Sequence, residues 1–187
     1  MGVDKALTLR ARDGRLLLAV LAEELSGRFG QVALITNDPA KLEPLAELGP
    51  FRREADLHPG AGPAGAIHTA LKKLSGQPLF VMACDMPLID WTIIGQLRRL
   101  LEDSQADAAV PRHGERWEPL YAFYGPRTKP IFQTVLQDGR RAVRDVFAQV
   151  NTVYLDLPEG EAAEGLFNNL NTPADLRRTG LPISPEI

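Results

Sequence analysis

Asp85 is the residue whose type and position most clearly suggest chemistry. It follows the apolar run 79–83 within the tetrapeptide Cys84-Asp85-Met86-Pro87. That run predicts a buried parallel strand with a carboxylate at its carboxyl end, the edge at which ligands bind in open α/β sheets. A carboxylate there can hold Mg²⁺, which keeps several waters and bridges to substrate phosphates. The alternative is a turn-forming aspartate that caps the following helix.

Asp56 opens a second candidate segment, the glycine-rich stretch 56–65. It contains three glycines and two prolines directly before a helical pattern. Glycine lets the backbone approach a ligand closely, and the amino end of a helix favours anions. The Asp56 carboxylate could therefore bind a ribose or a base edge. An ordinary connecting loop with a solvated aspartate is the alternative.

Lysine, asparagine and arginine side chains supply further candidates. Lys5 suits phosphate as a point charge, although a lysine this close to a terminus can simply be solvated. Asn169 and Asn171 lie in the amide-dense segment 167–173, where such side chains can bind a metal's water shell or a ligand phosphate. A turn and helix cap explains part of that segment equally well. The arginines within 140–144 could either contact a phosphate or form a solvated basic face.

Composition limits the class of protein. The chain has 187 residues, 44% of them hydrophobic, and a formal net charge of −3. This balance gives no large basic field for nucleic acid, and neither a membrane span nor a signal peptide is expected. Cys84 is the single cysteine, which excludes an internal disulfide and favours the cytoplasm. Its position in the apolar run predicts a buried core residue instead of a nucleophile.

Strand-like and helix-like patterns alternate through the first two-thirds of the chain. Helices are predicted at 15–25, 39–48, 66–74 and 89–101, and strands at 31–36, 51–54, 79–84 and 107–112. This rhythm predicts a three-layer, Rossmann-like α/β fold, with a mostly parallel sheet and helices on both faces. Residues 117–124 are expected to add an antiparallel segment. Two helices split at 138–139, a strand at 152–157 and a final helix from Pro173 follow, all within one domain of residues 1–187.

Several motifs, taken in order, resemble the molybdenum cofactor guanylyltransferase family of nucleotidyltransferases. They are MGVDKAL at 1–7, DLHPGAGPAGA at 56–66, ACDMPLI at 83–89, VPR and EPLYA within 110–122, DGRRAV at 138–143, and NTPADL at 171–176. The resemblance implies a nucleotidyltransferase fold and transfer of GMP from GTP to molybdopterin, with pyrophosphate released and Mg²⁺ required. Molybdoenzymes or their chaperones would be further partners.

The same resemblance implies roles for individual residues. Lys5 matches the motif lysine that contacts the nucleotide and would act in catalysis with Asp85. Asp56 matches the acid of the GTP-binding loop, and Asp85 matches the metal-binding aspartate, which also serves the nucleotide. Asn169 and Asn171 match a pair on the pterin and metal side of the site.

The sequence departs from the family pattern at its start and in the second loop. Family members begin with a strand and a Leu-Ala-Gly-Gly loop before the segment that matches Met1. We therefore expect that strand and loop to be missing from residues 1–187, and GTP binding to be weak in this form. Ala64 replaces a leucine that is common after the Gly-Pro of the second loop. A CTP-using or sugar-phosphate nucleotidyltransferase, and a non-catalytic cofactor-binding module, remain alternatives.

Overall fold

The computed structural model describes residues 10–11, 15–38, 40, 51–74, 76–86, 88–158 and 183–184. The chain divides into two compact units, and each is described here by itself. The first unit comprises Met1–Ala55, Cys84–Ile89 and Glu164–Ile187, and the second comprises Asp56–Ala83 and Asp90–Ala163. The prediction of a single domain spanning residues 1–187 stays a prediction.

The first unit contains one helix and two short pairs of strands. Helix α2 (Leu17–Ser26), with Gly27 as the residue after its end, overlaps the helix predicted at 15–25. Strands β2 (Ala33–Thr36) and β3 (Arg52–Ala55) pair in parallel, so their carboxyl ends lie at the same edge. Strands β1 (Arg10–Ala11) and β9 (Ile183–Ser184) pair antiparallel. The predicted helices at 39–48 and from Pro173 lie outside the described residues.

The second unit is built on a five-stranded mixed sheet. Its strands are β4 (Leu79–Met82), β5 (Ala108–His113), β6 (Arg116–Trp117), β7 (Tyr121–Tyr124) and β8 (Thr152–Asp156). β7 pairs antiparallel with both β4 and β5, and β5 pairs in parallel with β8. β4, β5 and β8 therefore run in one direction, as the α/β rhythm predicts. β7 and β6 are the antiparallel addition expected from residues 117–124.

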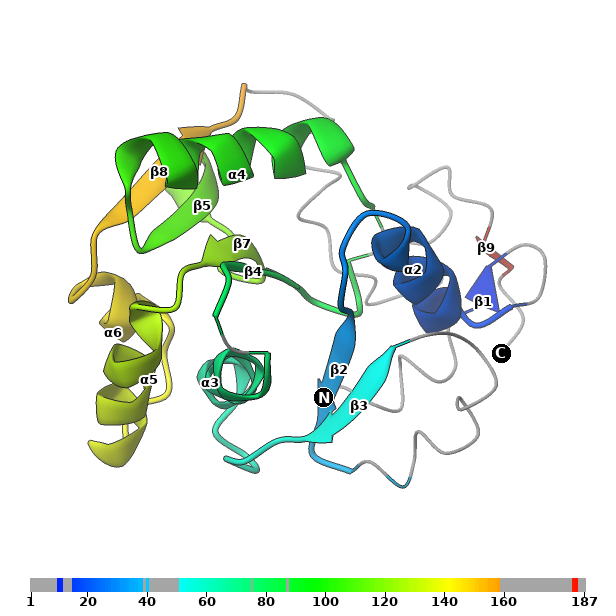
Figure 1. The fold of residues 1–187 in the computed structure, drawn as a ribbon, viewed down its shortest axis with the longest axis horizontal. Helices are drawn as coiled ribbons and strands as arrows, with labels where there is room; N and C mark the ends of the chain where they lie inside the picture. The colour runs from blue at the N-terminus through cyan, green and yellow to red at the C-terminus, as the bar shows by residue number, and fades with distance from the viewer. Residues whose placement is uncertain are drawn as a thin grey trace. The chain divides into compact units, whose positions relative to one another are not determined.

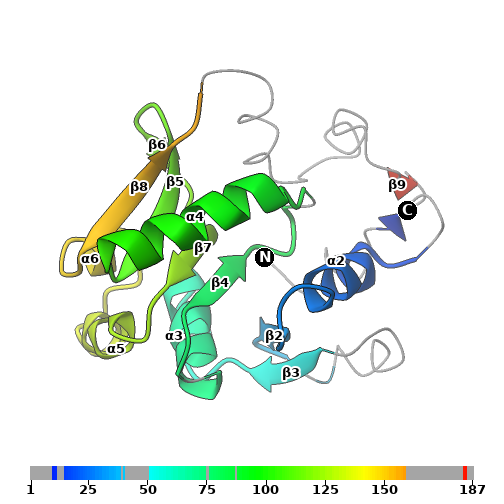
Figure 2. The ribbon, with the colours of Figure 1, turned by 45° about the horizontal axis from the view of Figure 1, so that its top comes forward.

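Helices cover both faces of this sheet (Figure 1). Helix α4 (Trp91–Ser104) contacts β5, β7 and β8, and Figure 2 shows it crossing in front of these strands. On the other face lie α3 (Pro63–Lys73), α5 (Thr128–Gln137) and α6 (Arg144–Phe147). The α/β class with helices on both faces is confirmed.

The alternation of side chains along the strands decides which of them enter the core between the sheet and α3, α5 and α6. Successive side chains of a strand point to opposite faces of the sheet. In β5 and β7, Ala108, Val110, Ala122 and Tyr124 belong to the core that faces α3, α5 and α6. The Tyr124 hydroxyl is satisfied inside that core because it donates to the carbonyl of Pro119 at 2.7 Å.

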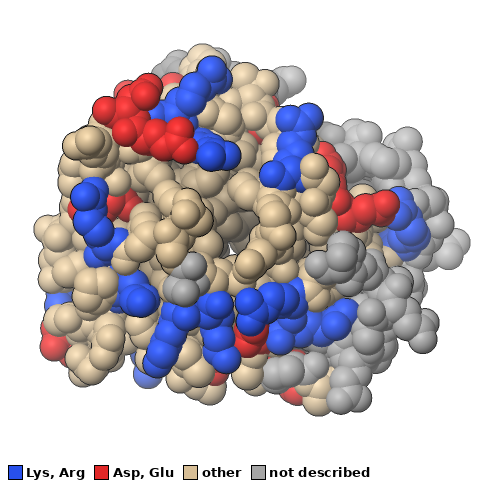
Figure 3. Space-filling view, viewed as in Figure 1, with Lys and Arg blue, Asp and Glu red and all other residues tan. Residues whose placement is uncertain are grey.

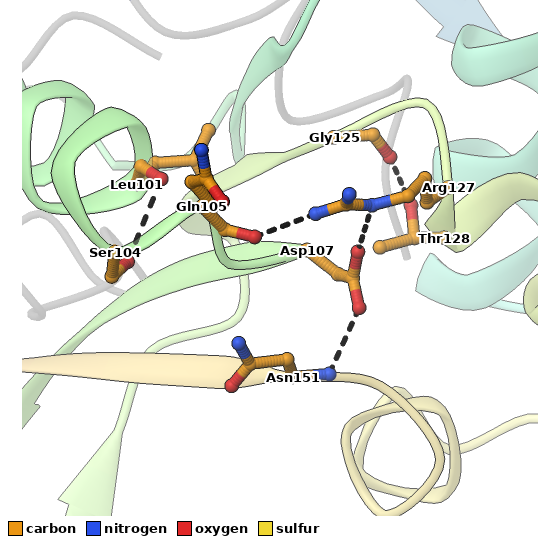
Figure 4. A network of polar contacts seen from close by, with 8 residues as sticks. All are labelled: Leu101, Ser104, Gln105, Asp107, Gly125, Arg127, Thr128 and Asn151. Carbon is orange, nitrogen blue, oxygen red and sulfur yellow. Dashed lines mark hydrogen bonds and ion pairs between the residues drawn. The ribbon is translucent and has the colours of Figure 1, made fainter.

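A polar network fixes the amino end of β5 (Figure 4). The Asp107 carboxylate accepts from Arg127 Nε at 2.6 Å and from the backbone N–H of Asn151 at 3.0 Å. A terminal nitrogen of Arg127 also donates to the carbonyl of Gln105 at 2.6 Å. One carboxylate thus ties the end of the α4–β5 connection to the start of α5 and to the residue before β8.

The surface of the described part carries both acidic and basic side chains, as the small net charge of −3 leads one to expect (Figure 3). On the face in Figure 3, acidic and basic side chains lie next to each other at several places. Arg98 with Glu102 and Arg140 with Asp138 form exposed ion pairs. Among the residues that the structure describes, no helix is both long enough and apolar enough to cross a membrane.

Candidate functional site

The glycine-rich loop between β3 and α3 adopts a backbone that requires glycine at two points. Gly60 has φ +76° and Gly62 has φ +68°, both in the region that L side chains rarely adopt. Between them, the N–H of Ala61 donates to the carbonyl of His58 at 2.9 Å. Gly62 is the residue before α3, and Pro63 occupies the first turn, where its missing N–H costs no helical hydrogen bond. The loop thus delivers the chain to a helix amino end, a favourable place for an anion.

Asp56 organises the start of this loop. One oxygen of its carboxylate, Oδ1, accepts from the backbone N–H of His58 at 2.9 Å and from the Thr69 hydroxyl at 2.8 Å. Thr69 Oγ1 in turn accepts from the N–H of Leu57 at 3.0 Å. Among the described residues, none donates to the second carboxylate oxygen of Asp56. The carboxylate therefore shapes the loop with one oxygen, while the other accepts no hydrogen bond from the described residues.

One face of α3 packs directly against the loop. Gly65, His68 and Thr69 are spaced i, i+3 and i+4, so they share that face. A Cβ on Gly65 would lie only 3.0 Å from the Cβ atoms of Ala61 and His58 and 3.1 Å from the carbonyl oxygen of His58. Glycine at position 65 is therefore what lets the helix approach the loop backbone.

The ring of His58 makes a second connection between the loop and α3. His58 Nε2 and His68 Nδ1 lie 2.8 Å apart, a hydrogen bond whose direction depends on the tautomers. His68 is only 4% exposed, whereas His58 is half-buried. Burial lowers the pKa of His68, and positive charge on His58, Lys72 and Lys129 lowers it further, while Asp56 raises it. The neutral form of His68 is thus favoured in the folded protein.

Arg141 reaches the same loop from a distant part of the sequence. Its guanidinium donates to the carbonyl of Gly60 at 3.0 Å, across 81 positions of sequence. The neighbouring Arg140 instead pairs with Asp138 at 2.8 Å. Arg141 therefore binds the loop and Arg140 makes an exposed ion pair, and a phosphate contact by the arginines within 140–144 stays a prediction.

Asp85 lies in a turn of the first unit and is half-buried. β4 ends at Met82, two residues before the predicted end at Cys84, so Asp85 follows the carboxyl end of the strand by three residues. The helix-capping alternative for Asp85 is wrong. Helix α4 is capped by Asp90, whose carboxylate accepts from the N–H groups of Thr92 and Ile93 at 2.8 and 3.1 Å.

Cys84 supports the interpretation of a core residue. It packs against the apolar cluster of the first unit, which includes Leu16, Ala19 and Phe51. Burial raises the pKa of the Cys84 thiol, and the adjacent Asp85 carboxylate raises it further. A raised pKa keeps sulfur protonated and unreactive near neutral pH, because the thiolate is the nucleophile.

The described residues contain two of the predicted site residues, Asp56 in the second unit and Asp85 in the first. Lys5, Asn169 and Asn171 lie outside the described residues. No group of three or more His, Cys, Asp or Glu side chains within the described part could hold a metal ion. Sequence reasoning missed His68 and Thr69, although their place on the predicted helix directly after the glycine-rich stretch was the available signal.

Comparisons with known proteins point in one direction. A family model described as a MobA-like NTP transferase domain matches residues 1–153. A protein of Methanothermobacter thermautotrophicus named "Probable molybdenum cofactor guanylyltransferase" is 31% identical over 182 residues, covering 95% of this chain and 91% of the relative.

Solved structures agree with this result. Molybdopterin-guanine dinucleotide biosynthesis protein A from Archaeoglobus fulgidus superposes with a TM-score of 0.74 at 28% identity, covering 89% of this chain and 84% of that one. The 2-C-methyl-D-erythritol 4-phosphate cytidylyltransferase of Thermus thermophilus shares the fold, with a TM-score of 0.69 at 19% identity over 94% of this chain and 92% of that one.

Proposed function

Because this chain belongs to the MobA-like NTP transferase family, we propose that it transfers GMP from GTP to molybdopterin and releases pyrophosphate. The observation that carries the proposal is the 31% identity to a probable molybdenum cofactor guanylyltransferase over 95% of the chain. The loop geometry supports it, since a glycine-shaped turn at the amino end of α3 suits a phosphorylated ligand. Its place of action would be the cytoplasm, which the single cysteine favours.

The reaction proposed is a direct displacement at phosphorus. A phosphate oxygen of molybdopterin attacks the α-phosphorus of GTP and forms a new P–O bond. The bond from that phosphorus to the oxygen bridging to the β-phosphate breaks, and pyrophosphate leaves with its electron pair. The protein's work is then to position the reactants and neutralise charge. The raised pKa of Cys84 agrees with a reaction that needs no thiolate nucleophile.

Mg²⁺ is proposed as the cofactor, with Asp85 as its protein ligand. The fit rests on the chemistry of this residue, since a half-buried carboxylate in the turn after β4 is a hard oxygen donor. Mg²⁺ is often held by one or two carboxylates together with substrate phosphates and water, so a larger protein cluster is not required. When bound, the ion would act as a Lewis acid on phosphoryl oxygens.

The remaining predicted residues take roles in this proposal. Asp56 would bind the nucleotide through the carboxylate oxygen that does not hold the loop. Lys5 would contact the nucleotide and neutralise charge on the departing pyrophosphate. Asn169 and Asn171 would lie on the pterin and metal side. Molybdoenzymes or their chaperones would receive the product.

The proposal is tested by measuring pyrophosphate release from GTP in the presence of molybdopterin and Mg²⁺. Asp85→Asn should abolish transfer while circular dichroism and the melting temperature stay near wild type. Asp103→Asn is the matched control, because Asp103 is an exposed carboxylate on α4. Near-normal turnover of Asp85→Asn would contradict the metal assignment. The same assay with GTP and CTP in competition tests the base, and a preference for CTP would overturn GMP transfer.

A further inference from the structure

The loop between Asp56 and α3 has few side chains with which it can be held. Residues 59–65 are proline, glycine and alanine only, so none of them carries a polar side chain. Leu57 is 42% exposed and is anchored through its backbone N–H alone among the contacts described. Of the loop's own side chains, Asp56 and His58 are therefore the ones that can anchor it, while Arg141 holds it from outside through the Gly60 carbonyl.

His58 is held from four directions. Its N–H donates to Asp56, its carbonyl accepts from Ala61, and its Cβ lies against the helix backbone at Gly65. Its ring makes the fourth contact, the 2.8 Å hydrogen bond to His68 Nδ1. That contact is the one that the His58 ring makes to a buried side chain, because His68 is 4% exposed on the loop-facing side of α3.

We propose that His68 is a positioning residue for the nucleotide-binding loop. It acts through its hydrogen bond to His58, which fixes the turn that carries Asp56, Gly60 and Gly62. This inference rests on the proposed function, because it gives His68 a part in GTP binding without any contact to GTP. In a packing role, His68 would affect the loop through all of its contacts. In the proposed role, it affects the loop only through the hydrogen bond to His58 Nε2.

The pair also limits how many protons this part of the loop can carry. With one proton between the two facing nitrogens the contact is kept, but with a proton on each the two N–H groups would point at one another. The charged and titratable groups that face His68 are His58 and Asp56 from the loop, Lys72 from α3 and Lys129 from α5. His58, Lys72 and Lys129 disfavour a positive charge on His68, and Asp56 favours one.

A double-mutant cycle separates positioning from packing. His68→Leu keeps a similar volume but cannot bond to His58, and His58→Ala removes the other partner. Loss of one hydrogen bond should weaken GTP binding by about three- to tenfold in each single variant. In the His58→Ala background, His68→Leu should cause no further loss, because its route to the loop is already gone. Equal losses in both backgrounds would overturn the proposal.

The conservative variant and a readout that needs no nucleotide complete the test. The amide of His68→Asn can place a hydrogen-bonding atom close to the position of Nδ1, so it should recover most of the affinity that His68→Leu loses. Amide hydrogen exchange of residues 57–62, measured without nucleotide, should be faster in His68→Leu and in His58→Ala than in wild type. In the double variant it should be no faster than in the single variants. Unchanged exchange in both single variants would refute the proposal. Faster exchange in a protein that binds no GTP would instead refute the proposed function and keep the positioning of the loop.

Discussion

Replacing Gly65 with alanine should destabilise the protein, although glycine-to-alanine changes within helices ordinarily stabilise. In α3 the new Cβ would lie 3.0 Å from the Cβ atoms of Ala61 and His58 and 3.1 Å from the His58 carbonyl oxygen. These atoms are fixed to the backbone, so they can make room only if the loop itself moves.

The magnitude follows from a comparison with Gly95 in α4. A Cβ at Gly95 meets only the flexible end of Arg99, at 3.9 Å. Gly95→Ala should therefore show the ordinary gain of about 1 kcal/mol. Gly65→Ala has a similar propensity gain, but overpacking typically costs about 1–3 kcal/mol. The two variants should differ by roughly that overpacking cost, with Gly65→Ala the less stable.

Urea unfolding of the two variants and wild type measures this difference. With a slope of about 2 kcal/mol per molar urea, the midpoints of the two variants should differ by about 0.5–1.5 M. Gly65→Ala should also weaken GTP binding, because the displaced loop carries Asp56. If Gly65→Ala equals Gly95→Ala in midpoint and wild type in GTP affinity, the close approach of α3 to the loop is not what these positions require.

Three further predictions concern the contacts around the loop and the sheet. Arg141→Ala should weaken GTP binding measured by calorimetry, because it frees the Gly60 carbonyl, whereas Arg140→Ala should leave it unchanged; equal effects would contradict the loop contact. Asp107→Ala should lower the free energy of unfolding by about 1–3 kcal/mol, because the N–H groups of Arg127 and Asn151 that donate to this carboxylate lose their acceptor. A decrease below about 0.5 kcal/mol, the size of an ordinary surface change, would contradict this. Arg112 lowers the pKa of Asp156, so the small stabilisation by this exposed pair is present above the ordinary aspartate pKa of about 3.9 and is lost as pH falls through the lowered value. Melting temperatures of Asp156→Asn and wild type should therefore converge in strong acid, and a gap that persists there would count against the pair.

Much of the fold could be predicted from the sequence because its signals are local. The helices α2, α3 and α4 and the strands β2, β3, β5 and β8 lie within a few residues of the predicted segments. The antiparallel character of residues 117–124 was also predicted correctly. The end of β4 was placed two residues too late, because an apolar run continues past the last ladder residue into a turn where Cys84 packs on the core of the first unit.

The candidate site was predictable in part. Asp56 and the glycines stood out because strained turns at helix starts demand particular residue types. His68 could not be identified from the sequence, because a single histidine on a helix indicates no role until its hydrogen-bond partner, His58, is known. The same holds for Asp85, whose capping alternative was removed only when Asp90 was found at the start of α4.

The sequence by itself determined the alternation of helices and strands, the glycine-rich loop before α3 and the family to which the motifs point. Each of these depends on residues close together in the chain, or on an ordered set of types. Tertiary structure alone decided that β7 lies between β4 and β5, that Arg141 rather than Arg140 binds the loop, and that His68 faces His58. Those outcomes join residues as far as 81 positions apart, and their selection depends on how helices pack on a sheet, which no local pattern encodes.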